Sequence, residues 1–167
     1  ARVMKEYIGA ANGRRGLDFN KAVAETFTKS GWRVWVEVQM TRLRCPASEA
    51  SGDIDVIAAK DGIIYLCECK ELSFARTITE VVEQLGRFRG RHGDALWKHM
   101  RRVEWVRRNA TELGRIVGQV PVGIRSLLVT SKIVPMQFTH DFPVQVVPMD
   151  SLEAYLGPNH DAEAAAI

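Results

Sequence analysis

Apolar and polar residues alternate along the first half of the chain in patterns typical of one helix followed by three strands. Residues 17–30 carry apolar side chains about every 3.6 positions, as in a helix with one buried face, and Gly31 stands where such a helix ends. Residues 32–40 alternate Trp and Val with polar residues, the pattern of a half-buried strand. Residues 53–60 and 63–70 are two apolar runs of strand length.

The second half of the chain predicts further helices and strands. An apolar helical stripe runs through residues 78–88, and a longer helix is predicted over 94–116. Apolar runs at 124–132 and 144–149 predict two more strands, and a short final helix is predicted to begin at the capping residue Ser151.

This order of elements predicts an α/β fold in which helices flank a central mixed β-sheet. The chain of 167 residues shows no repeat and no internal linker, so we expect a single domain over 1–167. Its core is expected over about 15–150, with residues 158–167 as a frayed tail.

A hairpin is the clearest local feature of the sequence. Residues 52–70 read GDIDVIAAKDGIIYLCECK, two apolar runs joined by Asp-Gly at 61–62. Asp-Gly between apolar runs strongly indicates a two-residue hairpin loop. Such a loop pairs Lys60 with Ile63 and thereby fixes the register of the two strands.

The register places charged residues opposite each other on one face of the hairpin. Asp55 falls opposite Glu68, and Asp53 falls opposite Lys70. Opposed carboxylates repel, so protonation of one of them or a bound cation must offset the repulsion. Hard cations such as Mg²⁺ take carboxylates together with water and phosphate oxygens, which suits metal-assisted phosphodiester hydrolysis. The alternative is a solvated face with a surface ion pair between Asp53 and Lys70, worth at most ~1 kcal/mol.

The segments GDIDVIA and CECK resemble the signature of the PD-(D/E)xK, or restriction-endonuclease-like, nuclease superfamily. The resemblance covers roughly residues 15–132 and implies an α-β-β-β-α-β core, to which this chain adds a basic helix. It implies that Asp55 and Glu68 bind Mg²⁺, or Mn²⁺ in its place, with the backbone carbonyl of Cys69 as a third ligand. Lys70 would complete the catalytic set by orienting or deprotonating the attacking water and stabilising charge on the phosphate.

The chain departs from the superfamily pattern at two places. Ile54 stands where many members have Pro before the Asp, and Asn20 stands where a metal-site Glu often occurs in the first helix. Glu25, further along that helix, is therefore a candidate ligand, and a solvated position is its alternative. Asp53 is a candidate ligand too, with pairing to Lys70 as its alternative.

The segment 84–109 is strongly basic although the whole chain carries a net charge of only +3. Such a block suggests an anionic partner on one face, and the arginines interleaved with tryptophans suit a nucleic-acid backbone or unpaired bases. A solvated helix face is the alternative. In relatives, a Gln or a basic residue on the helix after the E-x-K strand lies near the site. The residues expected to contact nucleic acid are Gln84, Arg87, Arg89, Arg91, Lys98, Arg101, Arg102 and Arg108.

The resulting hypothesis is a Mg²⁺-dependent endonuclease that hydrolyses phosphodiester bonds in DNA. The alternatives are a nuclease that acts on RNA and a non-catalytic nucleic-acid-binding or interaction module of a larger defence or repair protein. The resemblance makes a homodimer an expectation, and further domains are compatible with the start at Ala1. No apolar stretch reaches the roughly 18 residues that span a membrane, and Cys45, Cys67 and Cys69 are read as reduced thiols, so we expect a cytoplasmic protein.

Overall fold

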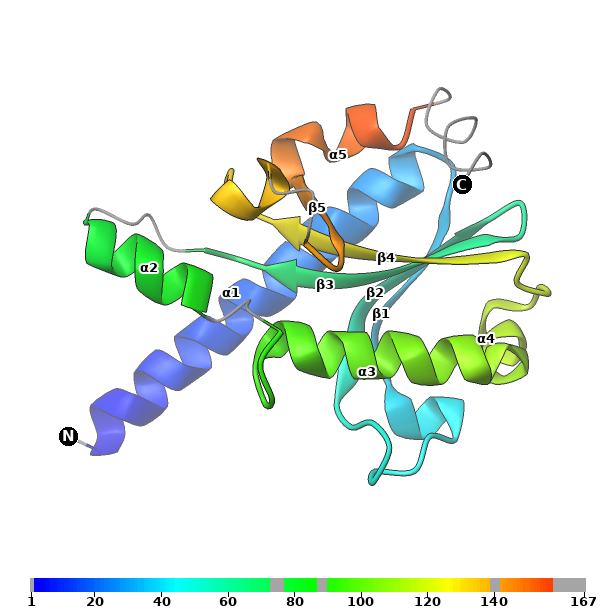
Figure 1. Ribbon diagram of the computed structural model, residues 1–167, viewed down its shortest axis with the longest axis horizontal. Helices are drawn as coiled ribbons and strands as arrows, with labels where there is room; N and C mark the ends of the chain where they lie inside the picture. The colour runs from blue at the N-terminus through cyan, green and yellow to red at the C-terminus, as the bar shows by residue number, and fades with distance from the viewer. Residues whose placement is uncertain (1, 73–76, 87–89, 139–141, 158–167) are drawn as a thin grey trace.

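The computed structural model describes residues 2–72, 77–86, 90–138 and 142–157 (Figure 1). Helices and strands alternate in the order that the sequence predicts. The elements are α1 (Arg2–Lys29), β1 (Arg33–Gln39), the 3-10 helix η1 (Met40–Leu43), β2 (Asp53–Lys60), β3 (Ile63–Lys70), α2 (Ile78–Gly86), α3 (Ala95–Arg108), α4 (Ala110–Val117), β4 (Gly123–Thr130), the 3-10 helix η2 (Pro135–Phe138), β5 (Gln145–Pro148) and α5 (Met149–Tyr155).

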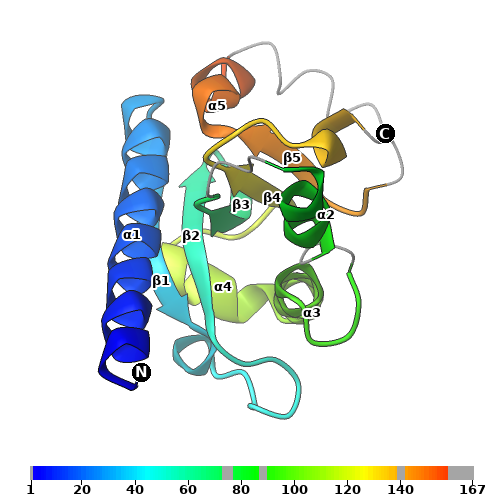
Figure 2. The same ribbon diagram turned by 90° about the vertical axis from the view of Figure 1, so that its left-hand side faces the viewer.

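The strands form one five-stranded mixed sheet in the order β1-β2-β3-β4-β5. The pairs β1–β2 and β2–β3 are antiparallel, whereas β3–β4 and β4–β5 are parallel. Helices α1 and α5 cover one face of the sheet, and α3 and α4 lie against the other (Figure 2). The predicted α/β class, a mixed sheet flanked by helices, is confirmed.

Two apolar layers bury the middle of this sheet from both sides. On the α1 face, Phe19, Val23 and Phe27 pack against the hairpin side chains Tyr65 and Cys67. On the other face, residues of α3 and α4 pack against alternate positions of the same strands. Because β2 and β3 are covered on both faces, a charged side chain in them needs a partner.

The predicted hairpin turn is confirmed. Asp61 and Gly62 have φ of 49° and 82°, the left-handed conformations that a two-residue loop requires. Lys60 pairs with Ile63, and the ladder continues in this register to the pair Val56–Cys67. It ends one residue before the predicted acid pair.

Three element boundaries differ from those predicted. The first helix begins at Arg2 rather than near residue 17, through a stretch without a regular apolar stripe. The predicted long helix is interrupted at Asn109, which has non-helical backbone angles and donates from its side chain to the carbonyl of Trp105. The last helix begins at Met149 and not at Ser151, because the extended Pro148 at the end of β5 is itself the N-cap.

Candidate active site at the end of the central hairpin

Glu68 of β3 is a buried carboxylate held between two cations. Its side chain is only 5% exposed and lies on the sheet face that α3 covers. Its Oε1 atom lies 2.7 Å from Nζ of Lys70, and its Oε2 atom lies 3.3 Å from Nη1 of Arg102. Burial of a carboxylate is costly unless it is paired, and these two contacts provide the pairing.

Asp55 of β2 lies beside Glu68 at the end of the hairpin. Its Oδ2 atom accepts a hydrogen bond of 2.7 Å from the backbone N–H of Cys69. Burial and the negative charge of Glu68 raise the pKa of Asp55 to about 6, although the Cys69 N–H and Lys70 act in the opposite direction. The mutual repulsion that the register predicts is therefore present, and a cation at this place would relieve it.

Arg102 reaches the site from α3. It is 8% exposed, and its Nε–H donates to the backbone carbonyl of Ser51 over 2.9 Å while Nη1 contacts Glu68. Gly52 leaves room for this guanidinium, since a Cβ added there would lie 2.8 Å from Nη2 of Arg102. The φ of Gly52 is +84°, a conformation that glycine adopts without strain.

His99 lies one helical turn before Arg102 and packs against the Glu68 carboxylate from α3. It is completely buried, with Nε2 2.8 Å from Oγ of Ser126 and Nδ1 3.7 Å from Oε2 of Glu68. Burial, together with the charges of Arg102 and Lys70, lowers the pKa of His99 to about 3. The imidazole is therefore neutral at physiological pH and contacts Glu68 without a charge.

His99 is not among the residues that the sequence predicts for the site, and Arg102 is predicted to contact nucleic acid on an open surface. A signal was present in the spacing of α3. The buried apolar residues Leu96, Val103 and Val106 define one side of this helix, and positions 99 and 102 fall on that same side. A polar residue on an apolar helical stripe is typical of a buried partner for another polar group.

The two further candidate ligands, Glu25 and Asp53, differ in where the structure places them. Glu25 is exposed on α1, which covers the opposite face of the sheet, and this favours its alternative, a solvated helix position. The backbone of Asp53 pairs with that of Gln39 across β1 and β2, and the negative charge of Asp53 adds to burial and to Glu68 in raising the pKa of Asp55. The ion pair that Lys70 makes is with Glu68 and not with Asp53, since the β2–β3 ladder ends before these residues come opposite each other.

The oxygen donors at this point fit a hard divalent cation. Asp55 offers its second carboxylate oxygen, and Glu68 offers oxygens that are already turned toward Lys70 and Arg102. The Cys69 N–H points toward β2, and the carbonyl of a strand residue lies on the same edge as its N–H. Across the described residues, no group of three or more His, Cys, Asp or Glu side chains could hold a metal ion. A cation here would thus take two carboxylates and a carbonyl, with its other positions left to water and phosphate, as Mg²⁺ commonly does.

A family model described as "Anti-phage protein Upx-like" matches residues 2–150. The chain belongs to the Upx-like family of anti-phage proteins. No curated protein matches this Upx-like chain. Among solved structures it is similar to a crystallised protein of unknown function, AF1548, at 15% identity and a TM-score of 0.41. The alignment covers 90% of the Upx-like chain and 66% of AF1548, so the chain spans less than two thirds of that protein.

The basic residues of the Upx-like chain divide into exposed ones and ones that hold a loop. Arg91 and Lys98 are exposed on the N-terminal side of α3. Arg101 donates from Nε to the carbonyl of Glu49 over 2.9 Å, and Arg108 lies 3.6 Å from the Glu49 carboxylate. Arg101 and Arg108 therefore stabilise the loop before β2, whereas Arg91 and Lys98 are better placed to contact a ligand in solution.

The other four expected nucleic-acid contacts are buried or lie partly or wholly outside the described residues. Arg102 is buried against Glu68 rather than exposed, which corrects its assignment to an open phosphate-binding surface. Arg87 and Arg89 lie outside the residues that the structure describes. Gln84 lies in α2, and its side chain is also outside the described part.

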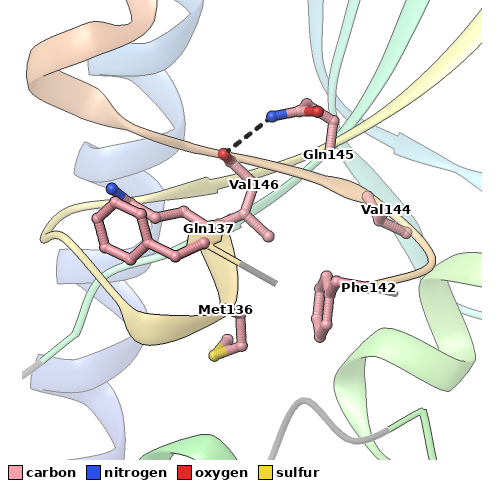
Figure 3. A pocket seen from close by; sticks show the side chains of 7 residues that line it. Met136, Gln137, Phe142, Val144, Gln145 and Val146 are labelled. Atoms are coloured by element: carbon pink, nitrogen blue, oxygen red, sulfur yellow. Dashed lines mark hydrogen bonds between the residues drawn. The ribbon is translucent and has the colours of Figure 1, made fainter. Parts of the chain in front are cut away.

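A hollow of about 430 Å³ lies at the β5 edge of the Upx-like fold, apart from the acid pair (Figure 3). Gln145 donates from its side chain to the carbonyl of Val146 beside it. The lining residues are Met136, Gln137, Phe138, Phe142, Val144, Gln145 and Val146.

Among the described residues, no helix combines the length and the apolar character that crossing a membrane requires.

Proposed function

We propose that this Upx-like chain is a Mg²⁺-dependent nuclease that hydrolyses phosphodiester bonds, in DNA rather than RNA, as part of defence against phage. One observation carries the proposal. Asp55 and Glu68 lie side by side in a largely buried site, with the Lys70 ammonium 2.7 Å from Glu68. The resemblance of GDIDVIA and CECK to the PD-(D/E)xK signature and the anti-phage family both support it.

Each residue of the site would have its own role in the reaction. Asp55, Glu68 and the carbonyl of Cys69 would hold the cation, and Mg²⁺ would supply charge stabilisation for the phosphate and activation of water. Burial lowers the pKa of Lys70, but Glu68 and Asp55 raise it by more, so the net shift is upward. Lys70 therefore stays protonated at neutral pH. This favours a role in orienting water and stabilising charge on the phosphate over a role as general base.

The test is a cleavage assay with matched lysine variants. Single-stranded, double-stranded and branched DNA, and RNA, are incubated with the protein in Mg²⁺, Mn²⁺ or EDTA. We expect cleavage of DNA with either metal and none in EDTA. Lys70→Ala should lower the rate by roughly 100-fold or more. Lys29→Ala is the control, because Lys29 is exposed at the end of α1 on the opposite face. Absence of cleavage by folded wild-type protein, or unchanged cleavage by Lys70→Ala, would contradict the proposal.

A second candidate function is nucleic-acid binding without cleavage. It is favoured by the engagement of both Glu68 oxygens, one with Lys70 and the other with Arg102, which leaves Glu68 already neutralised. Salt-dependent DNA binding in EDTA, with no cleavage in either metal, would support this function over the first.

A further inference from the structure

Arg102 connects three parts of the molecule that must keep a fixed geometry at the acid pair. Its own backbone belongs to α3, its Nε–H binds the carbonyl of Ser51 just before β2, and its Nη1 binds Glu68 of β3. We propose that Arg102 is a positioning residue for Glu68, so that the basic helix α3 sets the geometry of the site. This inference rests on the proposed nuclease function.

The planar guanidinium suits this task because its donors point in fixed directions. With Nε bound to Ser51, the position of Nη1 follows, and Oε2 of Glu68 is held at 3.3 Å. A flexible point charge such as lysine could contact one of the two acceptors but would not link them rigidly.

The surroundings of Arg102 keep it in this orientation. Gly52 leaves no Cβ in the way, since one would lie 2.8 Å from Nη2. On the other side of Glu68, the buried His99 lies 3.7 Å from the same Oε2 and is itself tied to Ser126. The Oε2 side of Glu68 is thus enclosed by α3.

The other oxygen of Glu68 points the opposite way. Oε1 contacts Lys70, whose side chain is 32% exposed and marks the open side of the site. Arg102 therefore turns Glu68 so that Oε1 faces the place where substrate arrives. A residue with this role acts on the rate of the bound complex, and a residue that contacts substrate phosphate acts on substrate binding.

The experiment compares Arg102→Met and Arg102→Lys with Arg91→Met, an exposed arginine close to the start of α3. Outer-shell partners of metal ligands typically contribute 10- to 100-fold in activity. We expect Arg102→Met to lower kcat by roughly 10- to 100-fold with KM within about twofold of wild type, and Arg102→Lys to recover part of the loss. Arg91→Met should instead raise KM. Wild-type kcat together with a raised KM in Arg102→Met would overturn the inference.

Two measurements without catalysis complete the test. Mn²⁺ titration by calorimetry should show binding to Arg102→Met at least as tight as to wild type, because a positive charge next to the cation has been removed. The changes in the free energy of unfolding in urea of Glu68→Gln, Arg102→Met and the double variant should be non-additive, and additive changes would overturn the inference.

If Arg102→Met does not fold, Arg102→Lys is used in its place throughout. Wild-type protein that cleaves nothing refutes the nuclease function, whereas cleavage by Arg102→Met at the wild-type rate refutes only the positioning role.

Discussion

The backbone N–H of Cys69 on β3 donates a hydrogen bond of 2.7 Å to the carboxylate of Asp55 on β2. This hydrogen bond lies beyond the last backbone pair of the hairpin ladder, which joins Val56 and Cys67. A side chain thus takes the place of a backbone acceptor at the point where the two strands separate. This fixes Asp55 on the hairpin beside Glu68, and the two carboxylates share a site on rigid strands.

The ionisation of Asp55 should destabilise the fold. Its pKa is raised from 3.8 to about 6 in the folded state, so the folded protein binds more protons than the unfolded chain between these values. The protonated Asp55 carboxyl makes its full favourable contribution to the free energy of unfolding below about pH 4. This contribution is lost as the pH rises through 6. The loss amounts to at most about 3 kcal/mol in the free energy of unfolding. Asp55→Asn keeps an oxygen acceptor for Cys69 and should gain stability relative to wild type over this range.

Urea unfolding at pH 4 to 7.5 in EDTA measures this difference. The exposed Asp150→Asn on α5 is the control and should show no such trend. Added Mg²⁺ at pH 7 should stabilise wild type and leave Asp55→Asn unchanged, since only the carboxylate binds the cation strongly. A constant difference between Asp55→Asn and wild type at all pH values would contradict the raised pKa.

Replacement of Glu68 by Gln should destabilise the protein by about 3 kcal/mol, because it leaves the Arg102 guanidinium buried without its charged partner. Urea unfolding at pH 7 provides the measurement. Glu71→Gln is the matched control, since Glu71 is an exposed residue just beyond the same strand. Equal small effects for the two variants would show that the ion pair with Arg102 contributes little.

The sequence was sufficient for the hairpin and for the closeness of the two acids. Asp61-Gly62 admits few turn types, so the register follows from local chemistry, and Glu68 lies near enough to Asp55 for its charge to add to burial in raising the Asp55 pKa. The spacing of α3 places Arg102 on the apolar side of the helix, but its partner could not be assigned from the sequence. The contact between Arg102 and Glu68 depends on how α3 packs against the sheet, which is a tertiary property that the spacing within one helix does not reveal.

The two alternatives for Glu25, metal ligand or solvated position, could not be separated from the sequence for a related reason. The sequence gives the separation of Glu25 from the hairpin along the chain, but not which face of that hairpin helix α1 covers. The pairing of Lys70 with Glu68 instead of Asp53 depends on where the ladder ends, and an ideal register assumes that the strands stay paired.

Gly52→Ala should disturb the site through Arg102. The φ of +84° makes any side chain at this position strained, and the new Cβ would lie 2.8 Å from Nη2 of Arg102. Gly118→Ala is a close control, because Gly118 also has a left-handed φ of +69° but has open space around it. Both variants should lose about 1 kcal/mol of stability from backbone strain. Only Gly52→Ala should also lose cleavage activity, measured under the conditions used for Arg102→Lys. Equal activity in the two alanine variants would show that displacement of Arg102 has no effect on catalysis.

The exposed cations beside α3 should contribute to nucleic-acid affinity through phosphate contacts. Arg91 and Lys98 are both exposed, and Arg101 and Arg108 are held by the loop at Glu49. Each phosphate contact that is lost lowers the slope of log Kobs against log[salt] by about 0.9. The double variant Arg91→Ala/Lys98→Ala should therefore bind DNA more weakly at low salt, with a slope shallower by about 2.

Fluorescence anisotropy with labelled DNA in EDTA measures this slope from 50 to 300 mM salt, a range over which phosphate contacts change affinity by orders of magnitude. The control Lys21→Ala/Lys29→Ala removes the same number of charges from exposed positions of α1, on the opposite side of the sheet. Because both double variants change the net charge equally, a general electrostatic effect would lower both slopes alike, and that result would contradict a binding surface at α3.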